Sequence, residues 1–181
     1  ESAGIKDGKY IITDLNGDGE ISDDDRTYVG DAQPDLTFGW QNNFTWKNWD
    51  FSFFFRGTIG NKVLNNPRAA YANNTYLIGT NALDEELTYT MKESSRVCSY
   101  YLENGSFIRL DNLALGYTFD TKKINWLDKA RLYFAAQNLF VITGYKGLDP
   151  EVELFRGESS DTDAGLSPGI EPRQFFPKAR T

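Results

Sequence analysis

The chain has 181 residues, of which 40% are hydrophobic and 15% aromatic, a composition that suits β-structure rather than disorder. A net charge of −7 argues against nucleic acid as a partner, and the lack of histidine excludes Ser-His-Asp and Cys-His catalysis and histidine-bound zinc. We expect no enzyme. The longest unbroken apolar run, Leu132 to Ala136, has five residues, whereas a membrane helix needs about 20. Any passage through a membrane must therefore use strands.

The first motif along the chain is an acidic loop, Asp14 to Asp25, within the Gly- and Asp-rich segment 1–35. The loop fits the calcium template D-x-[DN]-x-[DN]-G with an acidic residue in the twelfth place. Calcium takes six to eight oxygen ligands, and this spacing gathers oxygens around one point. The six acids in these twelve residues also repel one another unless they are neutralised. The expected calcium ligands are Asp14, Asn16, Asp18, Glu20, Ser22 and Asp25.

Two features of this loop depart from a helix-loop-helix calcium site. The twelfth residue is Asp25 and not glutamate, so its carboxylate has a shorter reach. The segment that precedes the loop, Tyr10 to Thr13, is expected to be extended. A solvated acidic turn without metal is the alternative, because Asn-Gly and Asp-Gly are turn dipeptides in any case. Both interpretations stay open.

Four segments further along the chain alternate apolar and polar residues with period two, which is typical of strands with one apolar face. Lys47 and Asn48 alone separate the first two, so these two are expected to form a tight antiparallel hairpin. The predicted strands are Leu36 to Trp46, Trp49 to Gly57, Ser106 to Phe119 and Ala130 to Ile142.

The connections between these strands alternate in length. The hairpin turn has two residues and segment 120–129 has ten, whereas the loop between the second and third strands covers about 58–105. The flanking segments 1–35 and 143–181 are long as well. Bacterial outer-membrane barrels combine short periplasmic turns with long extracellular loops in this way. We therefore expect strands in 36–142 between extracellular segments, the last of which leads to a missing strand.

Strand length and the placement of aromatic residues favour a barrel wall over a soluble β-sandwich, although both alternate. The predicted strands run nine to fourteen residues, and membrane strands need about 9–11. Polar side chains such as Gln41, Arg56 and Arg131 would face a wet lumen, with the rings of the other face toward lipid. Five aromatic residues gather near the short turns, as in an interfacial girdle: Trp46, Trp49, Tyr117, Phe119 and Trp126.

Four stretches of the sequence resemble SusC/RagA-type TonB-dependent transporters of Bacteroidetes. They are DLNGDGEISDDDRTYVGDAQPDLTFGW, NGSFIRLDNLALGYTF, YFAAQNLFVITGYKGLDPEV and PRQFFPKART, in the same order along the chain. The resemblance implies an all-β fold, namely the C-terminal part of a large plugged barrel in the bacterial outer membrane. The last strand and the plug of that family are expected to lie outside this chain, so its four strands form an incomplete wall.

The same resemblance implies a function. The family imports oligosaccharides or peptides together with a SusD-like surface lipoprotein, and TonB supplies energy through the plug. Outer-membrane lipid would surround the wall, and calcium would rigidify an extracellular loop. The alternative is a soluble extracellular calcium-stabilised β-module that binds glycans through exposed aromatics such as Tyr71, Tyr76, Tyr100 and Tyr101. A sheet packed over the apolar face would favour this alternative.

Overall fold

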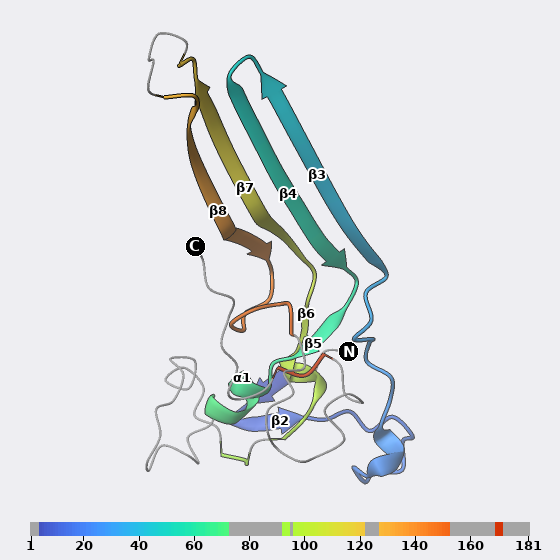
Figure 1. Ribbon diagram of the computed structural model, residues 1–181. Helices are drawn as coiled ribbons and strands as arrows, with labels where there is room; N and C mark the ends of the chain where they lie inside the picture. Colours follow the sequence, from blue (N-terminus) through green and yellow to red (C-terminus); the bar gives the residue numbers. More distant parts are fainter. Residues whose placement is uncertain (1–3, 73–91, 95, 122–126, 153–168, 172–181) are drawn as a thin grey trace, which may run out of the picture.

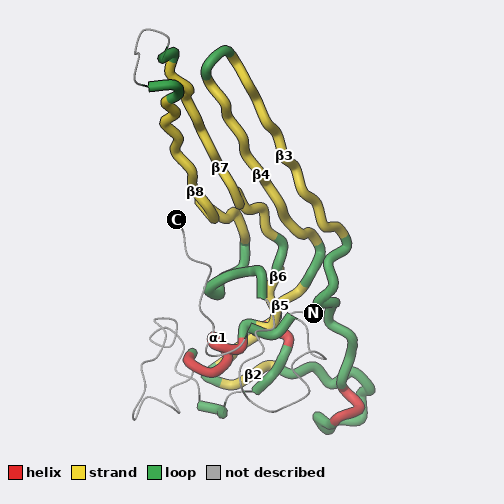
Figure 2. The backbone as a smooth tube through the Cα atoms, in the orientation of Figure 1, coloured by secondary structure: helices red, strands yellow, loops and turns green. Residues whose placement is uncertain are grey.

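The computed structural model describes residues 4–72, 92–94, 96–121, 127–152 and 169–171. Four long antiparallel strands lie side by side in the order β3-β4-β7-β8 (Figure 1). The strands rise together from a body of shorter elements, and the turn between β3 and β4 lies at the far end of the sheet (Figure 2). They are β3 (Leu36–Trp46), β4 (Trp49–Ile59), β7 (Phe107–Phe119) and β8 (Ala130–Thr143).

The alternating pattern predicts the positions of these strands closely. The bounds of β3 are the predicted ones, β4 runs two residues further than expected, and β7 and β8 each differ from expectation by one residue at one end. A two-residue turn joins β3 to β4, as predicted, and Lys47 takes a left-handed conformation there (φ 54°). The turn is tied to the neighbouring strand because the Thr118 amide donates to the Asn48 carbonyl at 2.8 Å.

The long loop predicted between the second and third strands contains structure that the sequence pattern did not indicate. It holds β5 (Lys62–Leu64), α1 (Asn66–Tyr71), a 3-10 turn (Ser99–Tyr101) and β6 (Leu102–Asn104). These elements are only three to six residues long, too short for a periodic pattern to show. No helix in the described part of the chain is long and apolar enough to cross a membrane.

The body below the sheet has a small core of its own. Tyr10, Ala69 and Tyr101 are buried together, and the hydroxyls of the two tyrosines lie 3.0 Å apart. Tyr10 lies on β2 (Lys9–Ile11), which pairs with β1 (Gly4–Lys6), and a 3-10 turn (Asp23–Asp25) follows in the acidic loop. Residues 169–171 add to the edge of β5 through a parallel bridge between Leu64 and Ile170. Segments from four parts of the chain therefore meet in this body.

Candidate functional site

The outward face of the long sheet is a band of exposed aromatic and aliphatic side chains. The register places Trp40 opposite Phe55 and Phe44 opposite Phe51. Trp40 is 58% exposed and Leu132 is 68% exposed, and no second sheet covers this face within the described residues. A soluble sandwich would bury these side chains in its core. Exposed rings on a long, one-sided sheet suit contact with lipid instead.

Aromatic side chains flank this band at the short-turn end. The rings of Trp49 and Tyr117 lie 4.7 Å apart between centroids, and those of Tyr117 and Phe119 lie 4.8 Å apart. Trp46 is 67% exposed beside them. Amphipathic rings at the edge of an apolar band are typical of a membrane interface. Trp126, which was expected in the same group, and Tyr76, expected in the long loop, lie outside the described residues.

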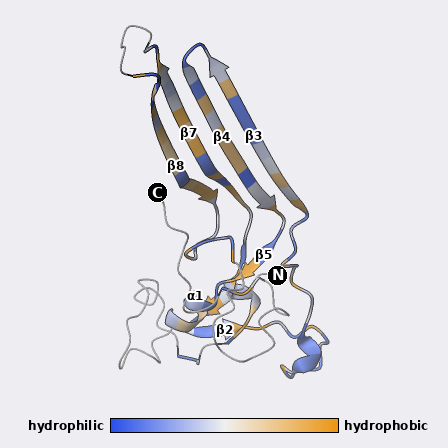
Figure 3. Cartoon of the chain, in the orientation of Figure 1, coloured by the Kyte–Doolittle hydropathy of each residue, from blue (hydrophilic) through white to orange (hydrophobic). Residues whose placement is uncertain are grey.

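The opposite face of the sheet is polar, and the strand register arranges it in rows across all four strands. One row contains Gln41, Phe54, Asn112 and Gln137, and the next row toward the short turns contains Asn43, Ser52, Ala114 and Ala135. Figure 3 shows hydrophobic and hydrophilic residues alternating along the strands that form these two faces.

Two irregularities in the strand register shift side chains on the polar face. Asp111 is an extra residue of β7, because Phe54 pairs with Asn112 while Phe55 pairs with Leu110. On β8, Asn138 takes a left-handed conformation (φ 50°) opposite the bulge at Asp111. Simple alternation placed Asn138 on the apolar face as an exception. The bulge instead lets the Asn138 Oδ1 atom accept a hydrogen bond from Arg109. Arg109 lies directly opposite Arg56 of β4 in the strand register.

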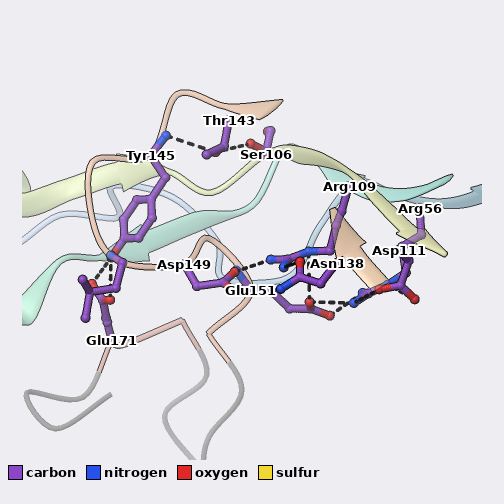
Figure 4. A network of polar contacts seen from close by, with 11 residues as sticks. Arg56, Ser106, Arg109, Asp111, Asn138, Thr143, Tyr145, Asp149, Glu151 and Glu171 are labelled. Carbon is purple, nitrogen blue, oxygen red and sulfur yellow. Dashed lines mark hydrogen bonds and ion pairs between the residues drawn. The ribbon is translucent and has the colours of Figure 1, made fainter. Parts of the chain in front are cut away.

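A polar network forms where the strands meet the loop end of the sheet (Figure 4). Arg56 and Arg109 are directly opposite each other on neighbouring strands, an arrangement of like charges that is unfavourable by itself. Carboxylates neutralise both. Arg109, only 1% exposed, pairs with Asp149 at 2.5 Å, and Arg56 pairs with Asp111 at 3.3 Å and with Glu151. Two of these carboxylates come from the segment after β8, so charge compensation fixes that segment to the wall.

The same segment is attached at its other side to the body. Glu171 is fully buried, and its carboxylate accepts hydrogen bonds from the Tyr145 hydroxyl at 2.5 Å and the Leu148 amide at 3.1 Å. Burial raises the pKa of the Glu171 carboxyl, and the hydrogen bond from Tyr145 opposes that shift. The Lys146 amide donates to Glu103 of β6 at 2.8 Å. Residues 144–151 therefore connect the wall to the loop body (Figure 4).

The acidic loop is exposed, and its predicted ligands hold the backbone of the loop. Asp14 accepts hydrogen bonds from the amides of Gly17 and Gly19 at 2.7 and 2.9 Å. The two glycines have positive φ angles of 78° and 85°, which L side chains rarely adopt. The side chains of Asn16 and Asp18 each accept a hydrogen bond from the backbone amide two residues further along the chain. These hydrogen bonds fold the loop into a tight turn, which both the calcium interpretation and the metal-free turn predict.

Asp25 closes the loop. Its carboxylate accepts from the Leu15 and Ser22 amides, both at 2.8 Å, and these backbone hydrogen bonds lower its pKa. The amide of Glu20 donates to Asp18, and the Ser22 hydroxyl accepts from the Asp24 amide. The described residues include no group of three or more acidic or cysteine side chains arranged to hold a metal ion.

The arrangement of the long sheet defines the class of the protein. Four long antiparallel strands with one exposed apolar face and one polar face form part of the wall of a membrane β-barrel. No family model matches the chain.

Known proteins identify the family. The chain is 34% identical to TonB-dependent receptor P3 of Formosa agariphila, over 91% of this chain and 18% of that receptor. It is 32% identical to TonB-dependent receptor SusC of Bacteroides thetaiotaomicron, over 79% of this chain and 15% of that receptor. The RagAB peptide importer in its open-open state matches with a TM-score of 0.69 and 25% identity, over 93% of this chain and 20% of that chain.

The chain belongs to the SusC/RagA-type TonB-dependent receptors, which are outer-membrane proteins of Bacteroidetes. It spans less than one fifth of the receptors P3 and SusC, so it corresponds to a segment of such a protein. These relatives are receptors and transporters rather than enzymes.

The network that joins the wall to the loops was missed by sequence reasoning. Alternation places Arg56 on the polar face, but nothing in the pattern indicates that Asp149 and Glu151 return to it from beyond β8. The signal that was available is the run Arg109-Leu110-Asp111-Asn112, in which three polar residues interrupt strict alternation. Such an interruption inside a long strand is typical of a β-bulge.

Proposed function

We propose that this segment forms barrel wall and extracellular loops of a TonB-dependent importer of oligosaccharides or peptides. The observation that carries the proposal is the exposed apolar face of the long sheet, in a chain homologous to TonB-dependent receptors. The polar face would line the route of the cargo. The soluble glycan-binding module is not favoured, because its core would have to cover the rings that are exposed here.

The proposed orientation places the two-residue turn in the periplasm and the body of short elements outside the cell. Segments 1–35, 58–105 and 143–181 would then be extracellular, with barrel strands in 36–142 between them. A SusD-like surface lipoprotein would cap the complete barrel on this side, and TonB would act from the periplasm through the plug. In this assembly the segment has a structural and cargo-contacting role and no catalytic one.

Uptake by cells that lack the complete receptor tests this proposal. The gene would be deleted in frame, and oligosaccharides and peptides remaining in a complex growth medium would be compared by mass spectrometry. We expect the deletion strain to leave a defined set of these compounds unconsumed, and the wild-type gene to restore their uptake. A protonophore should block the restored uptake, because TonB action depends on the proton gradient. Equal consumption by both strains, with the protein in the soluble fraction, would contradict the proposal.

We also propose that the acidic loop binds calcium as a structural ion through Asp14, Asn16, Asp18, Glu20, Ser22 and Asp25. The hydrogen bonds within the loop support this, because they hold its oxygens around a tight turn. A carboxylate has about four lone-pair sites, so one amide bond on an oxygen leaves others for a cation.

Hydrogen exchange of the loop peptide in the complete receptor, with calcium or with a chelator, checks the proposed site. We expect millimolar calcium to slow exchange across the loop at least several-fold, and Asp14→Asn to abolish this response. Asp24→Asn is the matched control, since Asp24 lies in the same loop outside the proposed ligand set and should leave the response intact. Exchange that is unchanged by calcium in the wild-type receptor would rule the site out.

A further inference from the structure

The chain contains two Asn-Gly pairs, the dipeptide at which asparagine side chains most readily lose their amide group without an enzyme. The pairs are Asn16-Gly17 in the acidic loop and Asn104-Gly105 at the end of β6. In this reaction the glycine nitrogen attacks the side-chain carbonyl carbon of the preceding asparagine, and glycine has no Cβ atom to hinder the approach. The contacts of the glycine amide and of the asparagine side chain therefore decide whether a given pair reacts.

The pair Asn104-Gly105 is fixed by the packed part of the molecule. Gly105 is buried, and its amide donates to the backbone carbonyl of Asn61 at 2.9 Å. The Asn104 Oδ1 atom accepts a hydrogen bond from the Ser106 amide at 2.9 Å. Ser106 is itself tied to β8, because its carbonyl accepts from the Thr143 hydroxyl at 2.9 Å. Attack by the Gly105 nitrogen would require this junction of strands to open.

The pair Asn16-Gly17 is held by side chains of its own loop instead. The Gly17 amide donates to Asp14 Oδ1 at 2.7 Å. The Asn16 side chain contacts Asp18 through both of its polar atoms, since Nδ2 donates to Asp18 Oδ2 and Oδ1 accepts from the Asp18 amide, each at 2.9 Å. Apart from its chain neighbours, no atom of the described residues lies within 4 Å of a Cβ atom built on Gly17. Local opening of the loop is thus enough to release this pair.

We infer that Asn16 is a site of spontaneous deamidation and that Asp14 controls the rate of this modification. The Gly17 nitrogen loses its proton and forms a bond to Cγ of Asn16, and the bond between Cγ and Nδ2 breaks. The Nδ2 group leaves as ammonia with the released proton, and a cyclic succinimide remains. Water then opens this ring at either of its carbonyls, which gives aspartate or isoaspartate.

The contacts of the loop oppose the first steps of this reaction. An amide N–H that donates to a carboxylate loses its proton less readily, so Asp14 protects the Gly17 nitrogen. Asp18 holds the Asn16 side chain, which must turn before its Cγ atom meets that nitrogen. Deamidation therefore proceeds from the open form of the loop, and each lost contact raises the population of that form.

The modification changes the charge of the acidic loop. The product carries one more negative charge, next to the six acids that the loop already contains. In the isoaspartate product the main chain is also one methylene longer, which alters the turn. The inference depends neither on the transport function nor on calcium binding, because it follows from contacts within the loop alone.

Peptide mapping of the complete receptor by mass spectrometry tests the inference. The receptor would be incubated at mildly alkaline pH with a chelator, so that calcium does not affect the result. We expect the peptide containing Asn16 to gain the mass of deamidation and to become a substrate for an isoaspartyl methyltransferase. The peptide containing Asn104 should stay unmodified over the same period. In Asn16→Asp the loop peptide should show no mass gain.

The control exerted by Asp14 is tested by substitution. Asp14→Ala should speed deamidation of Asn16 about ten-fold, as expected from the loss of one hydrogen bond to a charged group. Asp24→Ala is the matched control, because it removes a carboxylate of the same loop other than those that hold Asn16 and Gly17, and it should leave the rate unchanged.

Two results would overturn the inference. The first is an equal rate of Asn16 deamidation in the wild-type receptor and in Asp14→Ala. The second is deamidation of Asn104 that keeps pace with that of Asn16 in either protein, because the reaction would then follow general unfolding of the receptor instead of local opening of the loop.

Discussion

Asp149 is the carboxylate that compensates the buried charge of Arg109. We expect it to contribute more to the stability of the protein than the other carboxylates of the wall do. Asp149→Asn keeps the shape but leaves Arg109 without its closest counter-ion, at a cost of about 3 kcal/mol of stability. Asp50→Asn breaks the half-exposed pair with Arg131 and should cost about 0–1 kcal/mol. Urea unfolding of the complete receptor in lipid vesicles measures both, and equal costs would contradict the argument.

Glu171 makes the attachment of the loop segment sensitive to pH. Because burial raises its pKa above the ordinary value of 4.5, the folded protein binds this proton more tightly than the unfolded chain does. The stability that the folded protein gains by binding this proton is therefore fully present below about pH 4.5. This stability is lost as the pH rises through the pKa of Glu171 in the folded protein. Glu103 and Asp149 lie close enough to raise that pKa further.

Hydrogen exchange around Leu148, corrected for the intrinsic pH dependence of exchange, measures this effect. We expect protection of the peptide containing Leu148 to decrease as the pH rises above 4.5 in the wild-type receptor. Glu171→Gln cannot titrate and should give protection that is nearly constant with pH. A wild-type protection that increases with pH would show that the sign of the shift is wrong.

At the level of the element, β7 contains one extra residue, Asp111, which forms a β-bulge. Arg109 lies on the polar face while Leu110 faces outward opposite Phe55. Deleting Asp111 would restore regular pairing without turning Arg109, because Asn112, Leu110 and Arg109 would keep their partners Phe54, Phe55 and Arg56 on β4. We expect a loss of stability of only about 0–1 kcal/mol, because the deletion removes the partly exposed ion pair of Asp111 with Arg56 and leaves the buried pair of Arg109 with Asp149 in place.

Heat-modifiable migration of the complete barrel in gel electrophoresis measures the folded fraction of this deletion variant. Asp111→Asn is its control, because it keeps the extra residue and loses only a partly exposed ion pair with Arg56, worth about 0–1 kcal/mol. We expect the deletion variant to fold as well as Asp111→Asn, and a much lower folded fraction would contradict the pairing described for β4 and β7.

At the scale of the whole molecule, the two faces of the sheet face different solvents. Phe53→Arg places a charge on the apolar face near the middle of β4 and should cost about 2–4 kcal/mol in a bilayer. Ser52→Arg, one residue earlier on the polar face, should cost much less because the lumen is wet. Both variants would be folded into lipid vesicles, and their free energies of unfolding would be measured by urea titration. Similar losses of stability for the two variants would contradict a membrane wall.

The strands and their faces were predictable from the sequence because alternation is a local property. Each predicted strand has nine or more residues and alternates with period two over most of its length, and a two-residue turn leaves the hairpin β3–β4 no other register. The turn geometry of the acidic loop was predictable for the same reason, since Asp14 and the glycines it holds lie within six residues. Its affinity for calcium stays a prediction.

Only the tertiary structure determined how the loops are attached to the wall. Arg109 and Asp149 are 40 residues apart, and Tyr145 and Glu171 are 26 apart, so no local pattern links them. The bulges at Asp111 and Asn138 also depend on pairing with neighbouring strands, where the mutual compensation of buried charges outweighs regular alternation. The sequence by itself thus determined a wall with one apolar and one wet face. Long-range electrostatics decided which loop segment is fixed to it.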